Sequence, residues 1–279
     1  MIDLLSATKR YGDTAAIDRL TLHLSEKKIY CLLGRNGAGK TTLMNLISGK
    51  IRADEGKVMV DDERVTTLNM PESVRYIEAA KPQFNMRVSE LMKLAAGVDD
   101  KFDADFADRM VDKFRLERHK KYKSLSFGMK TMVTTIISLA SNSEIVLLDE
   151  PVLGFDAVMR KEFYDLLAES YENHPRIIIV STHLIDEIAG IAEKIIAIDS
   201  GKLLFYEDIN DVIEKSYKLS GAEDDVKHAT ANLNVVANEK IGKFAVAYVF
   251  DKRMAPQENV EVENLSLQDL FVKMVEGKN

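Results

Sequence analysis

A glycine-rich loop between a short apolar run and a helical pattern constrains this chain more than any other feature of its sequence. The apolar run is Lys28–Leu33, and the loop Gly34-Arg-Asn-Gly-Ala-Gly-Lys-Thr-Thr42 follows it directly. Apolar residues then recur at helical spacing until Gly49. The pattern G-x-x-x-x-G-K-[ST] between a strand and a helix is typical of a loop that binds phosphate. We therefore predict an α/β fold organised around this loop.

The residue types in this loop suit phosphate binding. Glycines let the loop curl tightly and bring bare backbone N–H groups close to phosphate oxygens. The Lys40 ammonium is expected to face the β- and γ-phosphates of a nucleotide, and the Thr41 hydroxyl to bind Mg²⁺. We expect this segment to bind the nucleotide through Gly34, Asn36, Gly37, Ala38, Gly39, Lys40, Thr41 and Thr42.

Two adjacent acids follow a second apolar run. Glu144–Leu148 is typical of a central parallel strand buried on both faces, and it ends in Asp149 and Glu150. Ligands of such sheets bind beyond the carboxyl ends of the strands, so both carboxylates would reach the nucleotide. We expect Asp149 to bind Mg²⁺, directly or through water, and Glu150 to polarise the attacking water.

A histidine follows the next buried strand. His183 comes directly after Arg176–Thr182, where its ring can donate to a γ-phosphate or orient the attacking water. A helix cap or a solvated side chain is the alternative for a single histidine at such a place. The remaining histidines lack a comparable context and are interpreted in that way, as helix caps or solvated side chains: His23, His119, His174 and His228.

Composition narrows the class of protein. The chain has 279 residues, and its net charge of −7 argues against a broad surface for nucleic acid. Its longest apolar run, Phe244–Phe250, is far shorter than the roughly 20 residues that cross a bilayer. The single cysteine, Cys31, excludes an internal disulfide and is typical of a reducing compartment. We expect a soluble cytoplasmic chain.

A second glycine-containing motif identifies a family. Leu125-Ser-Phe-Gly-Met129 precedes the apolar stretch Thr131–Ala140, so this loop opens a helix and can bind an anion. Together with the phosphate loop, the acidic pair and His183, in that order, it resembles the nucleotide-binding subunit of ABC transporters over roughly residues 1–206. The resemblance implies ATP and Mg²⁺ as cofactors. It also implies that Ser126 and Gly128 donate to the γ-phosphate held by a partner subunit.

The same resemblance assigns roles to further residues. Tyr11 matches the aromatic residue that stacks on adenine, although an ordinary strand tyrosine is the alternative. Asp156, after Gly154 and Phe155, matches the loop that couples the two nucleotide sites of a dimer.

The fold implied is a P-loop NTPase core of the ABC type with an inserted helical lobe and a small C-terminal extension. Residues 1–78 and 141–205 would form the core, residues 79–140 the lobe, and residues 206–279 an accessory segment. Within that segment we predict a helix over Ile209–Tyr217, a strand over Phe244–Phe250 and an amphipathic helix over Leu265–Val275.

Two positions depart from the family pattern. Phe127 replaces a glycine of the signature Leu-Ser-Gly-Gly-Gln, which we interpret as a marker of the bacterial export branch that includes bacitracin-resistance ATPases. Glu78 stands where the family has a glutamine that binds Mg²⁺ and senses the γ-phosphate, and Gln83 is the alternative for that role. A carboxylate still suits Mg²⁺, so Glu78 is predicted both as a metal ligand and as a coupling residue.

The resemblance implies an ATPase that dimerises, with itself or with a paralogue, around two ATP molecules. It would drive export by separate transmembrane permease subunits at the inner face of the cell membrane. The alternative is a nucleotide-gated regulatory module with weak hydrolysis, which Glu78 and Phe127 motivate. A role on DNA or ribosomes is disfavoured, because the chain has neither a long coiled-coil insert nor a second cassette.

Overall fold

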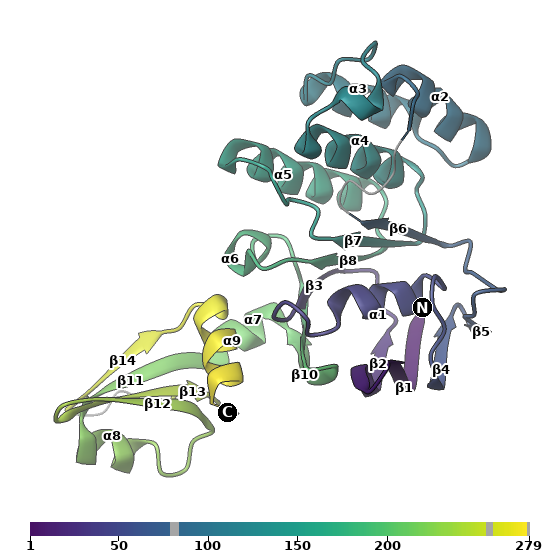
Figure 1. Ribbon diagram of the computed structural model, residues 1–279. Coiled ribbons are helices and arrows are strands. Elements are labelled where there is room, and N and C mark those ends of the chain that lie inside the picture. Colours follow the sequence, from purple (N-terminus) through teal and green to yellow (C-terminus); the bar gives the residue numbers. More distant parts are fainter. Residues whose placement is uncertain (79–83, 255–258, 278–279) are drawn as a thin grey trace. The chain divides into compact units, whose positions relative to one another are not determined.

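The computed structural model describes residues 1–78, 84–254 and 259–277, which form two compact units (Figure 1). The first unit comprises residues 1–183 and 196–205, and the second comprises residues 184–195 and 206–279. No helix in the described ranges is long and apolar enough to cross a membrane. Gln83, the alternative to Glu78, lies outside the described residues.

An antiparallel sheet in the order β2-β1-β4-β5 belongs to the first unit. Its strands are β1 (Ile2–Tyr11), β2 (Thr14–Leu24), β4 (Glu55–Val60) and β5 (Glu63–Arg64). The turn between β1 and β2 contains Gly12 in left-handed backbone, a conformation that glycine adopts without steric cost. Ile2, Leu4 and Ile17 are fully buried, so one face of this sheet joins the core.

A second sheet positions the predicted site. Its order is β10-β9-β3-β8-β7-β6. The strands are β3 (Ile29–Leu33), β6 (Val74–Glu78), β7 (Ile145–Asp149), β8 (Ile177–Ser181), β9 (Lys194–Asp199) and β10 (Lys202–Asp208). Every residue of β3, β7 and β8 is buried, which explains their uninterrupted apolar sequences. The parallel register aligns Glu78, Asp149 and Ser181 at one edge of the sheet.

Helices cover this sheet (Figure 1). Helix α1 (Lys40–Ile47) lies between the two sheets, where it contacts β2, β4 and β7. Helices α4 (Phe127–Ala140) and α5 (Ala157–Asn173) cover the opposite face, and α4 contacts β6 and β7. Helices α2 (Val88–Val98) and α3 (Ala104–Lys113) pack on α4. A short 3-10 turn, η1 (Tyr122–Ser124), leads into α4.

The second unit is built on an antiparallel sheet in the order β12-β13-β11-β14. Its elements are α6 (Ile185–Ile188), α7 (Ile209–Lys215), β11 (Ser216–Ala222), α8 (Glu223–Ala229), β12 (Val235–Ile241), β13 (Phe244–Phe250), β14 (Val260–Asn264) and α9 (Leu267–Glu276). Tyr217, Leu219 and Val249 form its core with Val226 of α8. Residues 184–195, expected in the core domain, group with this unit because α6 packs against α9.

Candidate nucleotide-binding site

The predicted phosphate loop connects β3 to α1 in a tight curl. Gly37 and Gly39 both have left-handed backbone, with φ of +84° and +107°. A Cβ on Gly39 would lie 2.4 Å from the carbonyl oxygen of Ala16, so no other residue fits there without displacement. Because α1 begins at Lys40, its unpaired N–H groups and the positive end of its dipole face the loop.

Lys40 is buried, and its ammonium lies back across this loop. Its Nζ donates to the carbonyl oxygen of Gly34 at 2.7 Å. The same Nζ lies 3.8 Å from Oε1 of Glu150. The Lys40 ammonium therefore lies between the phosphate loop and the carboxylate predicted to act as the base, so the two motifs meet in the fold.

Asp149 is buried at the end of β7 and held by hydroxyl groups. Its Oδ2 accepts from Thr41 Oγ1 at 2.7 Å and from the Tyr76 hydroxyl at 3.3 Å. Its Oδ1 accepts from Ser181 Oγ at 2.5 Å. These donors stabilise the charged carboxylate and fix its orientation. Burial and the neighbouring Asp149 and Glu78 carboxylates raise the pKa of the Tyr76 phenol, so it remains a donor.

Thr41 and Asp149 together offer the hard oxygen ligands that Mg²⁺ prefers. Among the described residues, no group of three or more His, Cys, Asp or Glu side chains could hold a metal ion by itself. Mg²⁺ usually takes one or two carboxylates and completes its shell with water and substrate phosphates. The Thr41–Asp149 pair beside the phosphate loop fits that requirement.

Glu150 has unusual backbone geometry. Its φ is +48°, a left-handed value that is uncommon outside glycine and clusters at functional sites. Its backbone N–H lies 3.1 Å from both the carbonyl oxygen and the Oγ of Ser181, which hold it in place. Its Oε2 lies 2.9 Å from Nδ1 of His183, whose side chain is 58% exposed. The Glu150 carboxylate, which follows β7, is therefore in hydrogen-bonding contact with the exposed His183 imidazole, which follows β8.

Cys31 lies on β3, close to Lys40 and Glu150, and its thiol is buried. Burial raises the pKa of the thiol to about 12, with the Glu150 charge adding to the rise. At neutral pH it is a protonated, inert thiol. It contributes packing to the strand beneath the phosphate loop.

Ser126, Gly128 and Asp156 lie in a second cluster. Ser126 caps α4, and its Oγ accepts from the Met129 N–H at 3.2 Å. Asp156 caps α5 and accepts from the Met159 N–H at 2.9 Å.

In this second cluster, two rings pack on two glycines. A Cβ on Gly128 would lie 3.1 Å from Cδ1 of Phe155. A Cβ on Gly154 would lie 3.1 Å from Cδ1 of Phe127. The signature loop and the loop after Glu150 therefore interlock. Phe127, interpreted from the sequence as a marker of the export branch, contributes directly to this packing.

Tyr11 and Glu78 occupy different surroundings. Tyr11 ends β1 with its ring 53% exposed, as an aromatic that stacks on a base requires. Glu78 ends β6, and its Oε1 lies 3.3 Å from Nζ of Lys50. Lys50 Nζ also lies 4.2 Å from the centroid of the Tyr76 ring. Glu78 is therefore paired with a lysine in this structure.

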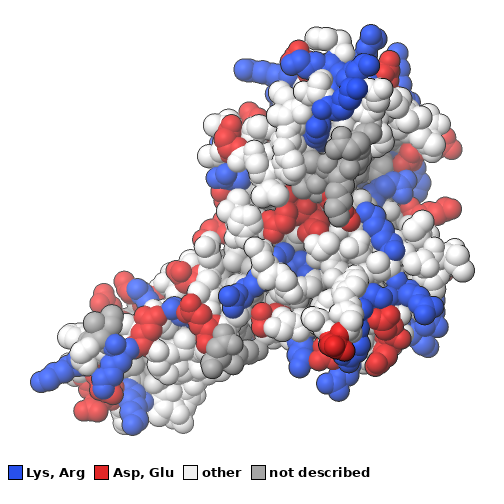
Figure 2. Space-filling view, in the orientation of Figure 1, with Lys and Arg blue, Asp and Glu red and all other residues white. Residues whose placement is uncertain are grey.

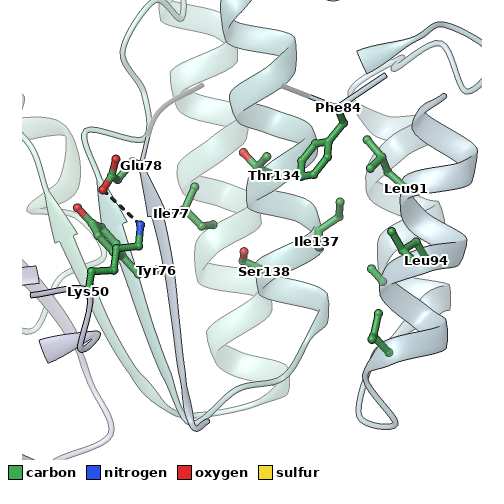
Figure 3. Close-up of a pocket in the computed structure, with 12 residues that line it drawn as sticks. Lys50, Tyr76, Ile77, Glu78, Phe84, Leu91, Leu94, Thr134, Ile137 and Ser138 are labelled. Carbon is green, nitrogen blue, oxygen red and sulfur yellow. Dashed lines mark hydrogen bonds and ion pairs between the residues drawn. The ribbon is translucent and has the colours of Figure 1, made fainter. Parts of the chain in front are cut away.

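A cavity of about 550 Å³ opens beside Glu78. Figure 3 shows Lys50, Tyr76 and Glu78 at one side and apolar side chains of α2 and α4 at the other. It is lined by Lys50, Tyr76, Ile77, Glu78, Phe84, Leu91, Leu94, Ala95, Val98, Thr134, Ile137 and Ser138. Leu94 and Val98 are well exposed on α2, a signal for an interaction surface.

Charged side chains of both signs are interspersed on the face of the first unit that Figure 2 shows. Paired charges such as Lys50 with Glu78 and Lys9 with Asp54 account for part of this mixture.

Comparison with known proteins identifies similar chains. A family model described as "ABC transporter" matches residues 17–153. The ABC transporter ATP-binding protein YtrB of Bacillus subtilis is 25% identical over 100% of this chain and 99% of its own length. The uncharacterized ABC transporter ATP-binding protein MJ1023 of Methanocaldococcus jannaschii is 30% identical over 77% of this chain and 80% of its own.

Two further comparisons bear on transport and on fold. The bacitracin transport ATP-binding protein BcrA of Enterococcus faecalis is 29% identical over 78% of this chain and 72% of its own length. A solved dimer of the ATP-binding cassette MJ0796, in a post-hydrolysis state with ADP and Pi, superposes with a TM-score of 0.65. It is 21% identical and covers 75% of this chain and 99% of its own, which shows a shared fold.

Proposed function

This chain belongs to the family of ABC transporter ATP-binding proteins, and from that premise we propose that it is the ATPase subunit of an exporter. One observation carries the assignment of the chemistry. Lys40, Thr41 with Asp149, and Glu150 with His183 converge at the carboxyl ends of three parallel strands. That is the edge at which doubly wound sheets bind their ligands.

The arrangement supports hydrolysis of the γ-phosphate by a positioned water. Loop N–H groups and Lys40 bind the phosphate oxygens, and the exposed Tyr11 ring stacks on adenine. Glu150 accepts a proton from the attacking water, whose oxygen bonds to phosphorus as the bond to the leaving ADP oxygen breaks. His183 orients Glu150 through the contact at 2.9 Å. Thr41 and Asp149 would hold Mg²⁺, which neutralises charge on the phosphates.

A complete site requires a second subunit in this proposal. Ser126 and Gly128, at the N-terminus of α4, would donate to ATP held by the partner, and Asp156 would link the two sites. The partner is a second copy or a paralogue. In this proposal, the nucleotide is bound by those parts of residues 1–78 and 141–205 that belong to the first unit, and the helices within residues 79–140 carry the signature.

The apolar cavity is the proposed docking place for a membrane subunit. The exposed side chains of Leu94 and Val98 on its wall suit contact with the apolar face of a partner helix. The volume of the cavity accommodates several side chains of such a helix. We assign it to a cytoplasmic helix of the permease, which would hold this chain at the inner face of the membrane. Export as the direction is supported by the Leu-Ser-Phe-Gly-Met signature and by the similarity to BcrA.

Substitution of Glu150→Gln tests the assignment of the base. Steady-state ATP hydrolysis should fall by about 10²- to 10⁴-fold, because the amide cannot accept the proton. ATP binding should persist and trap a dimer, visible as a doubling of mass in light scattering. Glu172→Gln, on an exposed position of α5, is the control and should hydrolyse ATP normally. Unimpaired turnover of the Glu150 variant would show that another group is the base.

A nucleotide-gated regulator with weak hydrolysis is the second candidate. The Lys50–Glu78 ion pair is the observation that favours it, because Glu78 would have to give up that pair before it could bind Mg²⁺ or sense the γ-phosphate. Turnover of the purified wild-type chain separates the two functions. A rate that Glu150→Gln does not lower would favour the regulator.

A further inference from the structure

Tyr76 touches both the docking cavity and the magnesium ligand. It lies on β6, next to β7, and its hydroxyl donates to Oδ2 of Asp149 at 3.3 Å. Tyr76 is also one of the residues that line the cavity, where its ring lies on the side of Lys50 and Glu78 (Figure 3). The same Oδ2 accepts from Thr41, so the tyrosine acts on the oxygen that faces the phosphate loop. One rigid side chain thus spans the sheet edge between the two sites.

The polar side of the cavity is a connected set of contacts. Nζ of Lys50 lies 4.2 Å from the Tyr76 ring centroid and 3.3 Å from Oε1 of Glu78. The Lys50 side chain is 46% exposed, whereas that of Glu78 is 11% exposed. A side chain that enters the cavity therefore meets Lys50 and the Tyr76 ring, and any shift of that ring moves its hydroxyl relative to Asp149.

A hydrogen bond donated to a carboxylate that holds a metal ion has a measurable effect on metal binding. A donor to a metal-binding carboxylate fixes the orientation of that carboxylate, and its loss typically costs 10- to 100-fold in metal affinity or activity. Within the part of the chain that the structure describes, the donors to the Asp149 carboxylate are Thr41, Ser181 and Tyr76, and of these only Tyr76 lines the cavity.

We propose that Tyr76 is a positioning residue through which an occupant of the cavity changes the affinity of Asp149 for the magnesium ion. The inference rests on the proposed function for the identity of the metal and of the occupant, a helix of the membrane subunit. It adds a route from docking to the nucleotide site that runs through a tyrosine hydroxyl. Metal affinity, rather than the chemical step, is the quantity controlled.

The first experiment removes the hydroxyl. In Tyr76→Phe with ADP bound, the dissociation constant for Mn²⁺, measured by electron paramagnetic resonance, should rise about tenfold. The Mg²⁺ concentration that half-saturates ATP hydrolysis should rise by a similar factor, while kcat at saturating Mg²⁺ changes less than about threefold. Tyr171→Phe is the matched control, since its hydroxyl donates to the Lys27 carbonyl oxygen at 2.6 Å. Unchanged Mn²⁺ affinity in Tyr76→Phe overturns the proposal.

The second experiment fills the cavity in a chain with normal Tyr76. Leu94, 52% exposed on the cavity wall, is replaced by cysteine and alkylated with N-phenylmaleimide. The native Cys31 is buried with a raised pKa, so it does not compete. Alkylation of Leu94→Cys should shift the Mn²⁺ dissociation constant at least threefold. Leu68→Cys, at a 99% exposed position outside the cavity, should show no shift after the same treatment.

A double variant decides the route. In Leu94→Cys combined with Tyr76→Phe, alkylation should leave the Mn²⁺ dissociation constant unchanged, because the connecting hydroxyl is absent. A shift that persists in the double variant contradicts the proposal. The outcomes also separate the two levels of inference. Absence of ATP hydrolysis with these Mn²⁺ effects intact would refute the proposed function alone, whereas normal hydrolysis without them would refute only the role of Tyr76.

Discussion

At the scale of single residues, the two left-handed glycines of the phosphate loop differ in their surroundings. A Cβ on Gly39 would lie 2.4 Å from the Ala16 carbonyl oxygen, whereas one on Gly37 would meet no heavy atom within 4 Å. Both substitutions strain the backbone, but only the first also forces two segments apart. The pair therefore separates conformational strain from steric exclusion within one loop.

Gly39→Ala should lower the free energy of unfolding by about 2–5 kcal/mol, since backbone strain and overpacking add. Gly37→Ala should lower it by only about 1–2 kcal/mol, the cost of the left-handed conformation. Urea unfolding of both variants and their ATP affinities measure the difference. Equal losses would show that the contact with Ala16 is relieved at little cost.

His183 offers a second prediction at this scale. His183→Ala should reduce kcat for ATP hydrolysis by about 10²-fold, because Glu150 loses the partner that orients it. His183→Gln retains a side-chain N–H and should recover part of that loss. Mant-ATP fluorescence should report near-normal binding in both variants. A fall in binding alone, with kcat intact, would instead assign His183 to the ground-state complex.

Some residues of the site could be predicted from local sequence motifs, whereas others could not. Lys40, Thr41, Asp149 and Glu150 follow from motifs because strand, loop and helix are contiguous there. Ser181 and Tyr76 were not predicted, although both hold Asp149. Their contribution arises from the order of neighbouring strands, with β6 and β8 on either side of β7, and a single sequence does not encode that order in any local pattern.

At the scale of elements, Arg176 ties α4 to α5 and β8. It is fully buried at the start of β8, and its guanidinium donates to the Leu139 carbonyl oxygen at 3.0 Å, near the C-terminus of α4. It also donates to Ser170 Oγ on α5 at 2.5 Å and to Asn142 Oδ1 at 3.1 Å. Burial lowers the pKa of the guanidinium to about 10, so the side chain is still charged at neutral pH. The cation also complements the negative end of the α4 dipole.

Arg176→Met should lower the free energy of unfolding by about 2–3 kcal/mol. The buried carbonyl and hydroxyl groups that accept from Arg176 would lose their donor, which costs free energy. Because the variant no longer buries a charge, it regains part of that free energy, but only part. Arg109→Met, which breaks a 3.7 Å ion pair with Glu169 on the surface, is the control and should change stability by less than about 0.5 kcal/mol. Chemical denaturation compares them. A stabilised Arg176→Met would mean that the desolvation cost dominates.

The helices and strands that could be predicted are those whose apolar residues follow a regular local pattern in the sequence. The strand over Phe244–Phe250 is confirmed as β13, and the terminal helix over Leu265–Val275 as α9. The helix expected over Ile209–Tyr217 ends at Lys215, because Ser216 and Tyr217 already pair with β13 in β11. The antiparallel sheet of β1, β2, β4 and β5 went unpredicted. Its half-exposed strands carry bulges that interrupt their alternation.

At the scale of the whole molecule, carboxyl groups in both units together determine how the stability of the fold depends on pH. Hydrogen-bond donors lower the pKa of a set of carboxyl groups spread over both units: Asp18, Asp54, Glu144, Glu239 and Asp251. Glu239 accepts from Lys273 and from the Tyr248 hydroxyl. Asp54 accepts from the Arg10 N–H and from Lys9. Each such group binds its proton less readily in the folded chain than in the unfolded chain.

The free energy of unfolding should therefore hold steady from pH 7 to about pH 5 and fall at lower pH. The contribution of these groups is present above their ordinary pKa values of 3.8 and 4.5, and it is lost as the pH drops through the lower folded values. Urea titrations between pH 7 and pH 3 measure the slope. Lys273→Met removes one of the two donors to Glu239 and should make the slope shallower. Stability that increased toward acid would contradict this account.

The interlocked rings and glycines have a consequence for the timing of events in a dimer. Phe127 rests on Gly154 and Phe155 on Gly128, so the start of α4 and the loop after Glu150 move as one body. In the proposed dimer, the start of α4 contacts the ATP bound by the neighbouring subunit, whereas the loop after Glu150 lies beside the ATP bound by the subunit itself. Occupation of one site would then alter the other by a shared coupling free energy, and the rate would rise sigmoidally with ATP concentration. The two sites would behave as a single cooperative unit.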